Sequence, residues 1–422
     1  MNEEILQYLW NFKKFRRLDF VSVDGKNIEV LEFGEWNKNS GPDFLFAKIK
    51  IDNIIFAGNI EIHTKASDWF FHNHSGNPEF GNLILHVVYI NDCDIPELEN
   101  QQIPTLELKD YIDETLIQKH QNLCKEHSFI PCEDLFDKDK IPLLFEEEVL
   151  LKKLDFKSES LELSLKKNQN NYEAVLFQQL AYTFGLKVNA EIFLQLGESL
   201  DFSVIQKIKQ NKTQLEALFF GICNFLDEPK DEMMTVWKRE FDFLKVKFNL
   251  EQVPVHPKFS KLRPPNFPTI RLSQLANLYH SQPNLFSKII AAKSIDDLYS
   301  TFDDISASEY WDHHFNFGKI SPVESQKLLS KDFIDLIIIN AILPMKYFYQ
   351  KNHNPEVVDD IFEFYKQLKP ERNSLLDEWK NLGVEFRNAL QTQAFLYHYK
   401  TFCTQKKCLN CAIGFQLLKS EA

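Results

Sequence analysis

Two acidic side chains on neighbouring predicted strands are the first candidates for chemistry. Asp43 opens the apolar run FLFAKIKI, and Glu61 and His63 close the run that follows. Asp52-Asn53 between the runs is a hairpin signal, so we expect antiparallel pairing that places opposed residues about 5 Å apart at Cα. Because side chains alternate along a strand, Glu61 and His63 point to the same side. Carboxylate oxygens in such a cluster suit Mg²⁺ or Mn²⁺, which would polarise a phosphodiester.

A histidine-rich segment follows these acids directly. Four of the twelve histidines lie within a stretch of 24 residues, and with Asp68 they form a possible ligand set: His63, Asp68, His72, His74 and His86. Imidazole and carboxylate are ligands of zinc and other transition metals, although this spacing matches no established metal motif. We predict that the segment, which includes Trp69, folds over the paired acids and contributes a base or a phosphate contact. The alternatives are a polar loop for His72 and His74 and a hydrogen-bonded core position for His86.

A basic, proline-stiffened loop is the third candidate. Residues 252–295 contain no acid, whereas 61 acids in 422 residues would place about six there. Within the loop over residues 252–275, we predict phosphate contacts from Lys258, Lys261, Arg263 and Arg271, because guanidinium groups bind phosphate in a bidentate manner. Nucleic acid is the partner that such a loop suits. The alternative is that the arginines pair with the surplus acids and hold the loop against the helices.

Three cysteines near the C-terminus form the fourth candidate. Cys403, Cys408 and Cys411 have the spacing C-x4-C-x2-C, beside Lys406 and Lys407. Thiolates at this spacing indicate zinc or an iron–sulfur cluster, and both usually take four protein ligands. The spacing does not distinguish between the candidates for the fourth ligand, which are His398, Cys223, Cys124 and Cys132. The alternative is a group of reduced thiols packed at a helix end.

Two sequence patterns describe the elements that must position these residues, and the change between them falls near residue 110. Before it, short runs rich in β-branched and aromatic residues predict a helix, three strands, a crossover, a fourth strand and an edge strand. After it, apolar residues recur every three or four positions, and the prolines of VPVHPKFSKLRPPNFP interrupt them with an extended loop. We therefore expect an α+β protein: a mixed, largely antiparallel sheet domain over residues 1–110, then a large irregular all-α domain over residues 111–422.

Composition excludes several classes of protein. The chain has a formal net charge of -13 and 44% hydrophobic residues. These values are typical of a globular protein and exclude disordered, collagen-like and coiled-coil chains. No run approaches the ~20 apolar residues of a membrane helix, and the N-terminus lacks a signal-peptide pattern. We expect a cytoplasmic protein without a membrane partner, in which the seven cysteines are thiols or metal ligands.

The N-terminal element order resembles that of PD-(D/E)XK nucleases, in which an Asp at the start of one strand and an acid-x-Lys triplet on the next form the active site. Asp43 and Glu61 match this pattern, and His63 stands at the lysine position, with Lys48 or Lys65 as candidates to replace that lysine. The resemblance implies a restriction-endonuclease-like fold and metal-dependent hydrolysis of DNA or RNA. His63 would then activate or orient the attacking water.

Five strings are spread along nearly the full length of the chain: GEWNKNSGPDF, GNIEIHTKASDWFFHNH, LILHVVY, LRPPNFPTIRLSQLA and CLNCAIG. Through these strings, in this order, the chain as a whole resembles a bacterial family, domain of unknown function 2851. This resemblance implies a stand-alone bacterial cytoplasmic protein. Two other functions stay open beside the nuclease. One is a nuclease-like domain that only binds nucleic acid or a protein partner, which His63 at the lysine position favours. The other is a zinc-dependent hydrolase that uses the histidines on a small substrate.

Overall fold

The computed structural model describes residues 3–37, 41–72, 74–113, 129–353 and 358–419. The chain forms two compact units. The sheet unit comprises Met1–Leu143, Glu378–Val384 and His398–Ala422, and the helical unit comprises Leu144–Asp377 and Glu385–Tyr397. This division lies further along the chain than the expected boundary at residue 110. The C-terminal cysteines also belong to the sheet unit and not to the helical one, because Leu409 packs into the core of the sheet unit.

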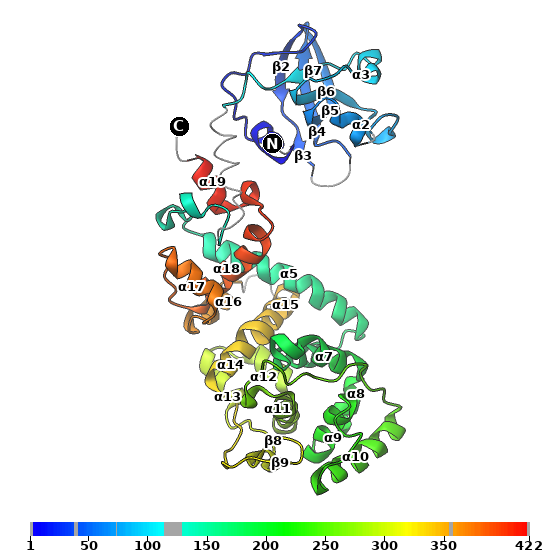
Figure 1. The fold of residues 1–422 in the computed structure, drawn as a ribbon, viewed down its shortest axis with the longest axis vertical. Helices are drawn as coiled ribbons and strands as arrows, with labels where there is room; N and C mark the ends of the chain where they lie inside the picture. The colour runs from blue at the N-terminus through cyan, green and yellow to red at the C-terminus, as the bar shows by residue number, and fades with distance from the viewer. Residues whose placement is uncertain (1–2, 38–40, 73, 114–128, 354–357, 420–422) are drawn as a thin grey trace. The chain divides into compact units, whose positions relative to one another are not determined.

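The sheet unit begins with helix α1 (Glu3–Asn11) and contains a seven-stranded mixed sheet (Figure 1). The strand order is β1-β2-β4-β5-β6-β7, and β3 pairs with β4. Strands β1 to β5 pair antiparallel, whereas β5, β6 and β7 run parallel. The bounds are β1 (Phe20–Val21), β2 (Asn27–Glu32), β3 (Glu35–Trp36), β4 (Phe44–Ile51), β5 (Ile54–Lys65), β6 (Leu83–Ile90) and β7 (Thr105–Glu107). The expected mixed sheet with a preceding helix is therefore confirmed.

The β4–β5 hairpin sets the register of the candidate acids. Asp52 and Asn53 have φ values of 47° and 70°, the left-handed conformations of a two-residue turn that matches strand twist. Pairing runs from Ile51 opposite Ile54 to Phe44 opposite Ile60, with an irregularity between Phe44 and Ala47. The residue before Phe44 therefore lies opposite the residue after Ile60.

The two faces of the sheet bury different side chains because the strands are covered on both sides. Ile60, Ile62, Leu85 and Val87 pack into the core that includes α1. The opposite face packs against a second cluster from the crossover segments, which are α2 (Asp68–Phe71), η1 (Pro78–Phe80) and α3 (Pro96–Asn100). Glu61, His63 and His86 alternate with the first set, so they point to the second face.

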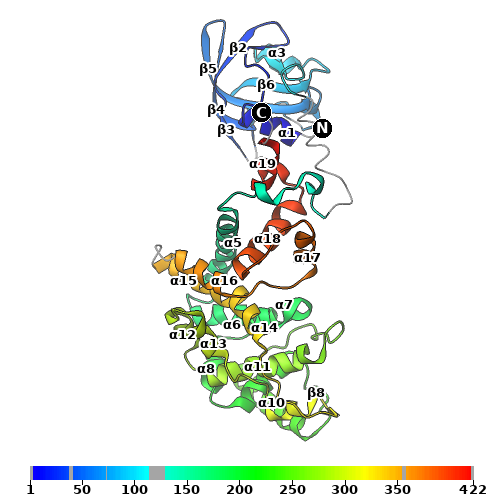
Figure 2. The same cartoon turned by 90° about the vertical axis from the view of Figure 1, so that its left-hand side faces the viewer.

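The helical unit confirms the predicted change to helices after the sheet. A second view (Figure 2) shows α11 among the other helices, and α11 is buried over nearly its whole length. No helix in the described ranges has the length and apolar character needed to cross a bilayer. The bounds from here to the C-terminus are α5 (Phe145–Lys167), α6 (Tyr172–Phe184), α7 (Leu186–Ser199), α8 (Phe202–Ile208), α9 (Lys212–Ile222), α10 (Glu232–Phe248), α11 (Pro268–Ser281), α12 (Leu285–Ala291), α13 (Ile295–Phe302), α14 (Lys331–Ile337), α15 (Leu343–His353), α16 (Val358–Gln367), α17 (Ser374–Asn381), α18 (Ala389–His398) and α19 (Ala412–Lys419).

Candidate active site

Two hydrogen bonds between backbone and side chain connect the segments that carry Asp43 and Glu61. The backbone N–H of Asp43 donates to Glu61 Oε2 at 3.1 Å, and the backbone N–H of Ile62 donates to Asp43 Oδ2 at 2.9 Å. Gln7 of α1 donates through Nε2 to Asp43 Oδ1 at 2.7 Å. The structure therefore brings together the two acids that the hairpin predicted.

Burial makes it costly for these two carboxyl groups to be ionised. Burial, and after it the charge of Glu61, raise the pKa of Asp43 to about 8, although the hydrogen bond from Ile62 opposes both. Burial also raises the pKa of Glu61, against the hydrogen bond from Asp43. Two desolvated like charges favour the uptake of a proton or a cation.

Three histidines converge beside this pair. His63, His72 and His74 each offer one ring nitrogen, and these atoms all lie within 4.8 Å of one another. Glu61 Oε1 lies 3.2 Å from His74 Nε2 and 3.6 Å from His63 Nε2. The side chain of His63 is 0% exposed, that of His74 12% and that of His72 43%, so exposure rises toward His72. We call Asp43, Glu61 and these three residues the histidine site.

The inner end of the histidine site is a hydrogen-bonded chain across three strands. His63 Nδ1 lies 2.9 Å from His86 Nε2, and His86 Nδ1 lies 3.3 Å from Thr105 Oγ1. Burial lowers the pKa of His63 to about 2 and that of His86 to about 3, so both rings are neutral. The arrangement that leaves a lone pair on His63 Nε2 has His86 Nδ1–H donating to Thr105 and His63 Nδ1–H donating to His86. Metal binding requires this tautomer of His63.

Two buried nitrogens in the site lack hydrogen bonds. His63 Nε2 and His74 Nε2 make none with any residue that the structure describes, although both face Glu61 Oε1. Buried polar atoms are normally satisfied, so an exception needs a physical reason. Imidazole lone pairs and a carboxylate oxygen repel unless a proton or cation lies among them. The donor set therefore fits a divalent metal ion, which Glu61, His63 and His74 would hold, with His72 at the exposed side of the site.

The crossover supplies the walls of the site. Trp69 is buried, and its ring makes edge contacts with His74 at 5.3 Å and His86 at 5.6 Å between centroids. Phe80 packs on His74 at 4.1 Å. Asp68 accepts a hydrogen bond from the backbone N–H of Lys65 at 2.9 Å, so it closes the turn after β5. In the structure, this segment folds over the paired acids, as predicted.

Three further residues contribute to the site although no sequence pattern singled them out: Glu3, Gln7 and Thr105. Glu3 Oε1 lies 3.8 Å from His72 Nδ1, and burial raises the pKa of this acid. The spacing of Glu3 and Gln7 by four residues on a helix was the available signal, since it places both on one face. Thr105 gave no signal, because its contact depends on the parallel pairing of β6 and β7.

Lys48 does not reach the lysine position of the nuclease pattern. Its Nζ lies 2.7 Å from Glu32 Oε1 in an exposed ion pair between β2 and β4. His63 lies two residues after Glu61 on β5, at the position that the resemblance assigns to lysine.

The basic loop belongs to the helical unit, and one of its four predicted phosphate contacts is used inside that unit. Lys258, Lys261 and Arg263 are exposed. Arg271 lies on the buried helix α11, where its guanidinium donates to Gln274 Oε1 at 2.8 Å and to Asn266 Oδ1 at 2.5 Å. It also lies 3.4 Å from the centroid of the Phe333 ring. The prediction of a phosphate contact was wrong for Arg271, because its helix is covered on all sides.

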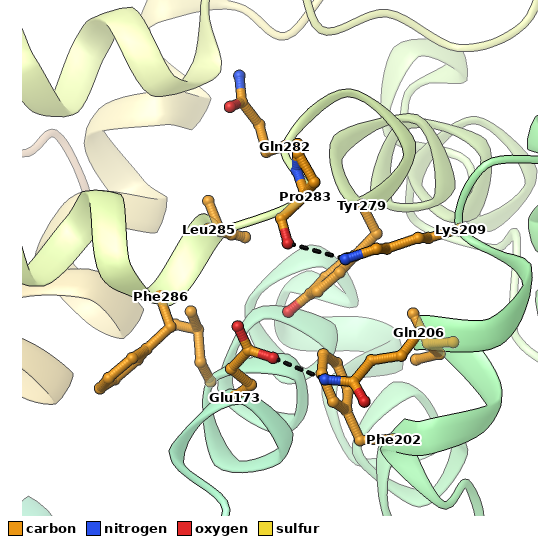
Figure 3. Close-up of a pocket in the computed structure, with 11 residues that line it drawn as sticks. Glu173, Phe202, Gln206, Lys209, Tyr279, Gln282, Pro283, Leu285 and Phe286 are labelled. Carbon is orange, nitrogen blue, oxygen red and sulfur yellow. Dashed lines mark hydrogen bonds between the residues drawn. The ribbon is translucent and has the colours of Figure 1, made fainter.

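A separate pocket in the helical unit offers weaker chemistry (Figure 3). Its charged and amide groups are paired: Gln206 Nε2 donates to Glu173 Oε2 at 2.9 Å, and Lys209 Nζ donates to the carbonyl of Pro283 at 3.0 Å, whereas the buried Tyr279 hydroxyl makes no hydrogen bond with the described residues. Paired groups of this kind need no ligand. The histidine site is the stronger candidate for catalysis.

The structure separates the candidates for the fourth ligand of the cysteine site. Cys132 lines the same pocket as Cys403, Cys408 and Cys411, together with His398. Cys223 lies in the core of the helical unit, and Cys124 lies outside the described residues.

Comparison with known proteins identifies the family. A comparison with curated proteins found no match, and a comparison with solved structures found none. The family model described as "Protein of unknown function (DUF2851)" matches residues 3–374, a range that contains the whole histidine site and ends before Cys403. Because that match covers most of the chain, the protein belongs to the DUF2851 family.

Proposed function

We propose that the protein is a metal-dependent phosphodiesterase that cleaves DNA or RNA at the histidine site. One observation carries this proposal: two buried ring nitrogens without hydrogen bonds, those of His63 and His74, face the same oxygen of Glu61. A cation satisfies all three atoms at once. A mixed set of imidazole and carboxylate ligands favours Mn²⁺ or another transition metal over Mg²⁺.

The arrangement of the elements supports a phosphodiester as the bond that is cleaved. A helix, antiparallel strands, a crossover and a parallel strand follow one another, with an acid before β4 and an acid on β5, as in PD-(D/E)XK nucleases. A divalent ion in such a site supplies positive charge to the phosphate and lowers the pKa of a nearby water. The exposed loop residues Lys258, Lys261 and Arg263 would bind the nucleic-acid backbone.

The roles of the side chains follow from their exposure. His63 and His74 are deep enough to act as ligands, and His86 holds His63 in the binding tautomer. His72 is 43% exposed and lies beside Glu3, so this pair would accept a proton from the attacking water. Asp43 fixes the strand of Glu61 through the N–H of Ile62.

Cleavage by the Glu61→Gln variant tests the proposal. Purified protein with Mn²⁺ should cut labelled single-stranded DNA, duplex DNA or RNA in a gel assay. Removing one ligand charge should lower the rate by at least ~10²-fold, since even residues behind a metal ligand are worth about 10–100-fold. Binding of Mn²⁺, measured by titration calorimetry, should weaken in parallel.

Glu29→Gln is the matched control, because Glu29 is also a strand glutamate but pairs with exposed Lys50 away from the site. It should keep full activity. Undiminished cleavage by Glu61→Gln, or no cleavage of any of the three substrates by the unchanged protein, would contradict the proposal.

A zinc-dependent hydrolase of small substrates is the second candidate. The observation that favours it is the approach of three histidine ligand atoms to within 4.8 Å, since three protein ligands and one open position are typical of catalytic zinc. Elemental analysis separates the two functions. Zinc that is lost from a His72→Ala/His74→Ala variant, without nuclease activity in the unchanged protein, would select this candidate.

A further inference from the structure

A second cluster of metal-ligand side chains lies in the sheet unit, built from segments far apart in the sequence. Cys132 precedes the short helix η2 (Glu133–Leu135), Cys403 ends η8 (Tyr399–Cys403), and Cys408 begins η9 (Cys408–Asn410). Cys411 follows η9 and directly precedes α19. All four are buried and line one pocket with His398 and Trp379. Each is a thiol in the structure.

Backbone groups of α19 and of the preceding turn lie close to Cys411 and Cys408. The N–H of Gly414, in the first turn of α19, donates to Cys411 Sγ at 3.3 Å, and His398 Nε2 lies 3.2 Å from the same sulfur. A Cβ on Gly414 would come within 2.2 Å of the carbonyl oxygen of Cys408. Glycine is therefore required for α19 to close on the turn that carries Cys408 and Cys411. N–H donors directed at sulfur stabilise a thiolate that binds a metal.

Four cysteines around one pocket match the ligand sets of zinc and of an iron–sulfur cluster. Tetrahedral zinc with Zn–S bonds of about 2.3 Å draws its sulfurs to about 3.8 Å from one another. Four cysteine sulfurs line the pocket, and the imidazole of His398 lies beside one of them, so all four protein ligands of a cluster can be cysteine. An iron–sulfur cluster is larger and takes four cysteine ligands.

We propose that Cys132, Cys403, Cys408 and Cys411 bind an iron–sulfur cluster of the [4Fe–4S] type. His398 lies beside the cluster and donates to Cys411 without being a ligand. The site joins residue 132 to the C-terminal segment, so the cluster fastens that segment to the sheet unit. This inference is independent of the proposed hydrolase, because none of its ligands belongs to the histidine site.

Anaerobic purification of the full chain tests the assignment. The unchanged protein should be brown, absorb broadly near 400 nm and contain about four iron and four acid-labile sulfide atoms per chain. Cys132→Ser should lose most of this iron and sulfide. Two variants should keep it: His398→Gln, because His398 is not a ligand, and Cys93→Ser, because Cys93 does not line the pocket.

Three results would overturn the assignment. One is unchanged protein without iron after reconstitution with ferrous iron and sulfide. Another is zinc in the unchanged protein that disappears in Cys132→Ser. The third is iron that is retained by Cys132→Ser but lost from His398→Gln. This result would make His398, and not Cys132, the fourth ligand. Because iron, sulfide and zinc are measured in the unchanged protein, the test stands even if Cys132→Ser does not fold.

Discussion

At the scale of single residues, function depends on neighbours that hold each chemical group in one state. His63 is useful to a metal only if its Nε2 carries the lone pair. The chain through His86 and Thr105, with contacts of 2.9 Å and 3.3 Å, leaves that lone pair when His63 Nδ1–H donates to His86. Residues that orient a ligand in this way contribute to metal affinity although they do not touch the metal.

His86 is therefore predicted to be a positioning residue. His86→Leu removes the acceptor of the His63 Nδ1–H and should weaken Mn²⁺ binding by about 10–100-fold. His86→Gln retains a carbonyl acceptor and should restore most of the affinity. Titration calorimetry measures the binding, and a thermal melt of each variant reports folding. If the Leu and Gln variants bind Mn²⁺ equally well, the positioning role is wrong.

At the scale of elements, the site depends on the precise register of β5 between an antiparallel and a parallel neighbour. Gly58 lies where β5 approaches the start of β6. A Cβ there would come within 2.5 Å of the Asn82 carbonyl oxygen and 2.6 Å of Ile84 Cγ2. Glu61 and His63 follow Gly58 on the same strand, so a displacement of β5 at this point moves both of them.

Gly58→Ala is accordingly predicted to destabilise the sheet unit by about 1–3 kcal/mol, the usual cost of overpacking. Urea denaturation measures this change, and hydrogen exchange of the peptide over β5 localises it. Gly81→Ala is the control, since its added Cβ meets only the Pro78 carbonyl at 3.2 Å and its φ of −65° suits alanine. Equal losses from the two variants would show that β5 register is not the cause.

At the scale of the whole molecule, polar groups buried in the helical unit stabilise it without forming a site. Arg271 binds Gln274 and Asn266 inside this unit, and Glu216 is 1% exposed within it. Burial raises the pKa of Glu216, whereas the hydrogen bond from Ser273 and the charge of Lys212 oppose the shift. Such a group makes the stability of the unit depend on pH.

The sign of this dependence follows from the raised pKa. The folded state holds the proton of Glu216 more tightly than the unfolded chain does, so its contribution is complete below pH 4.5 and is lost as pH rises through the raised value. Glu216→Gln keeps a neutral side chain and should gain stability relative to the unchanged protein as the pH rises from 4.5 upward. Thermal unfolding followed by circular dichroism across this range measures the difference. Glu232→Gln, at an exposed position in α10, should show no such trend.

The sequence by itself predicted what depends on local order along the chain. Strand alternation and the turn at Asp52-Asn53 were sufficient to place Asp43 opposite Glu61 and to turn His63 to the same side. The change from a period of two to a period of three or four separated the sheet from the helices. These features could be predicted because they rest on neighbours only a few residues apart.

Only the tertiary structure decided which distant residues meet. It brought Thr105 behind His86, and it brought Cys132 to three cysteines more than 250 residues further along the chain. It also buried Arg271, which local composition had indicated as a phosphate contact. The physical reason is that periodicity shows which way a side chain points from its own element. Which element it meets depends on how the whole chain buries its apolar surface.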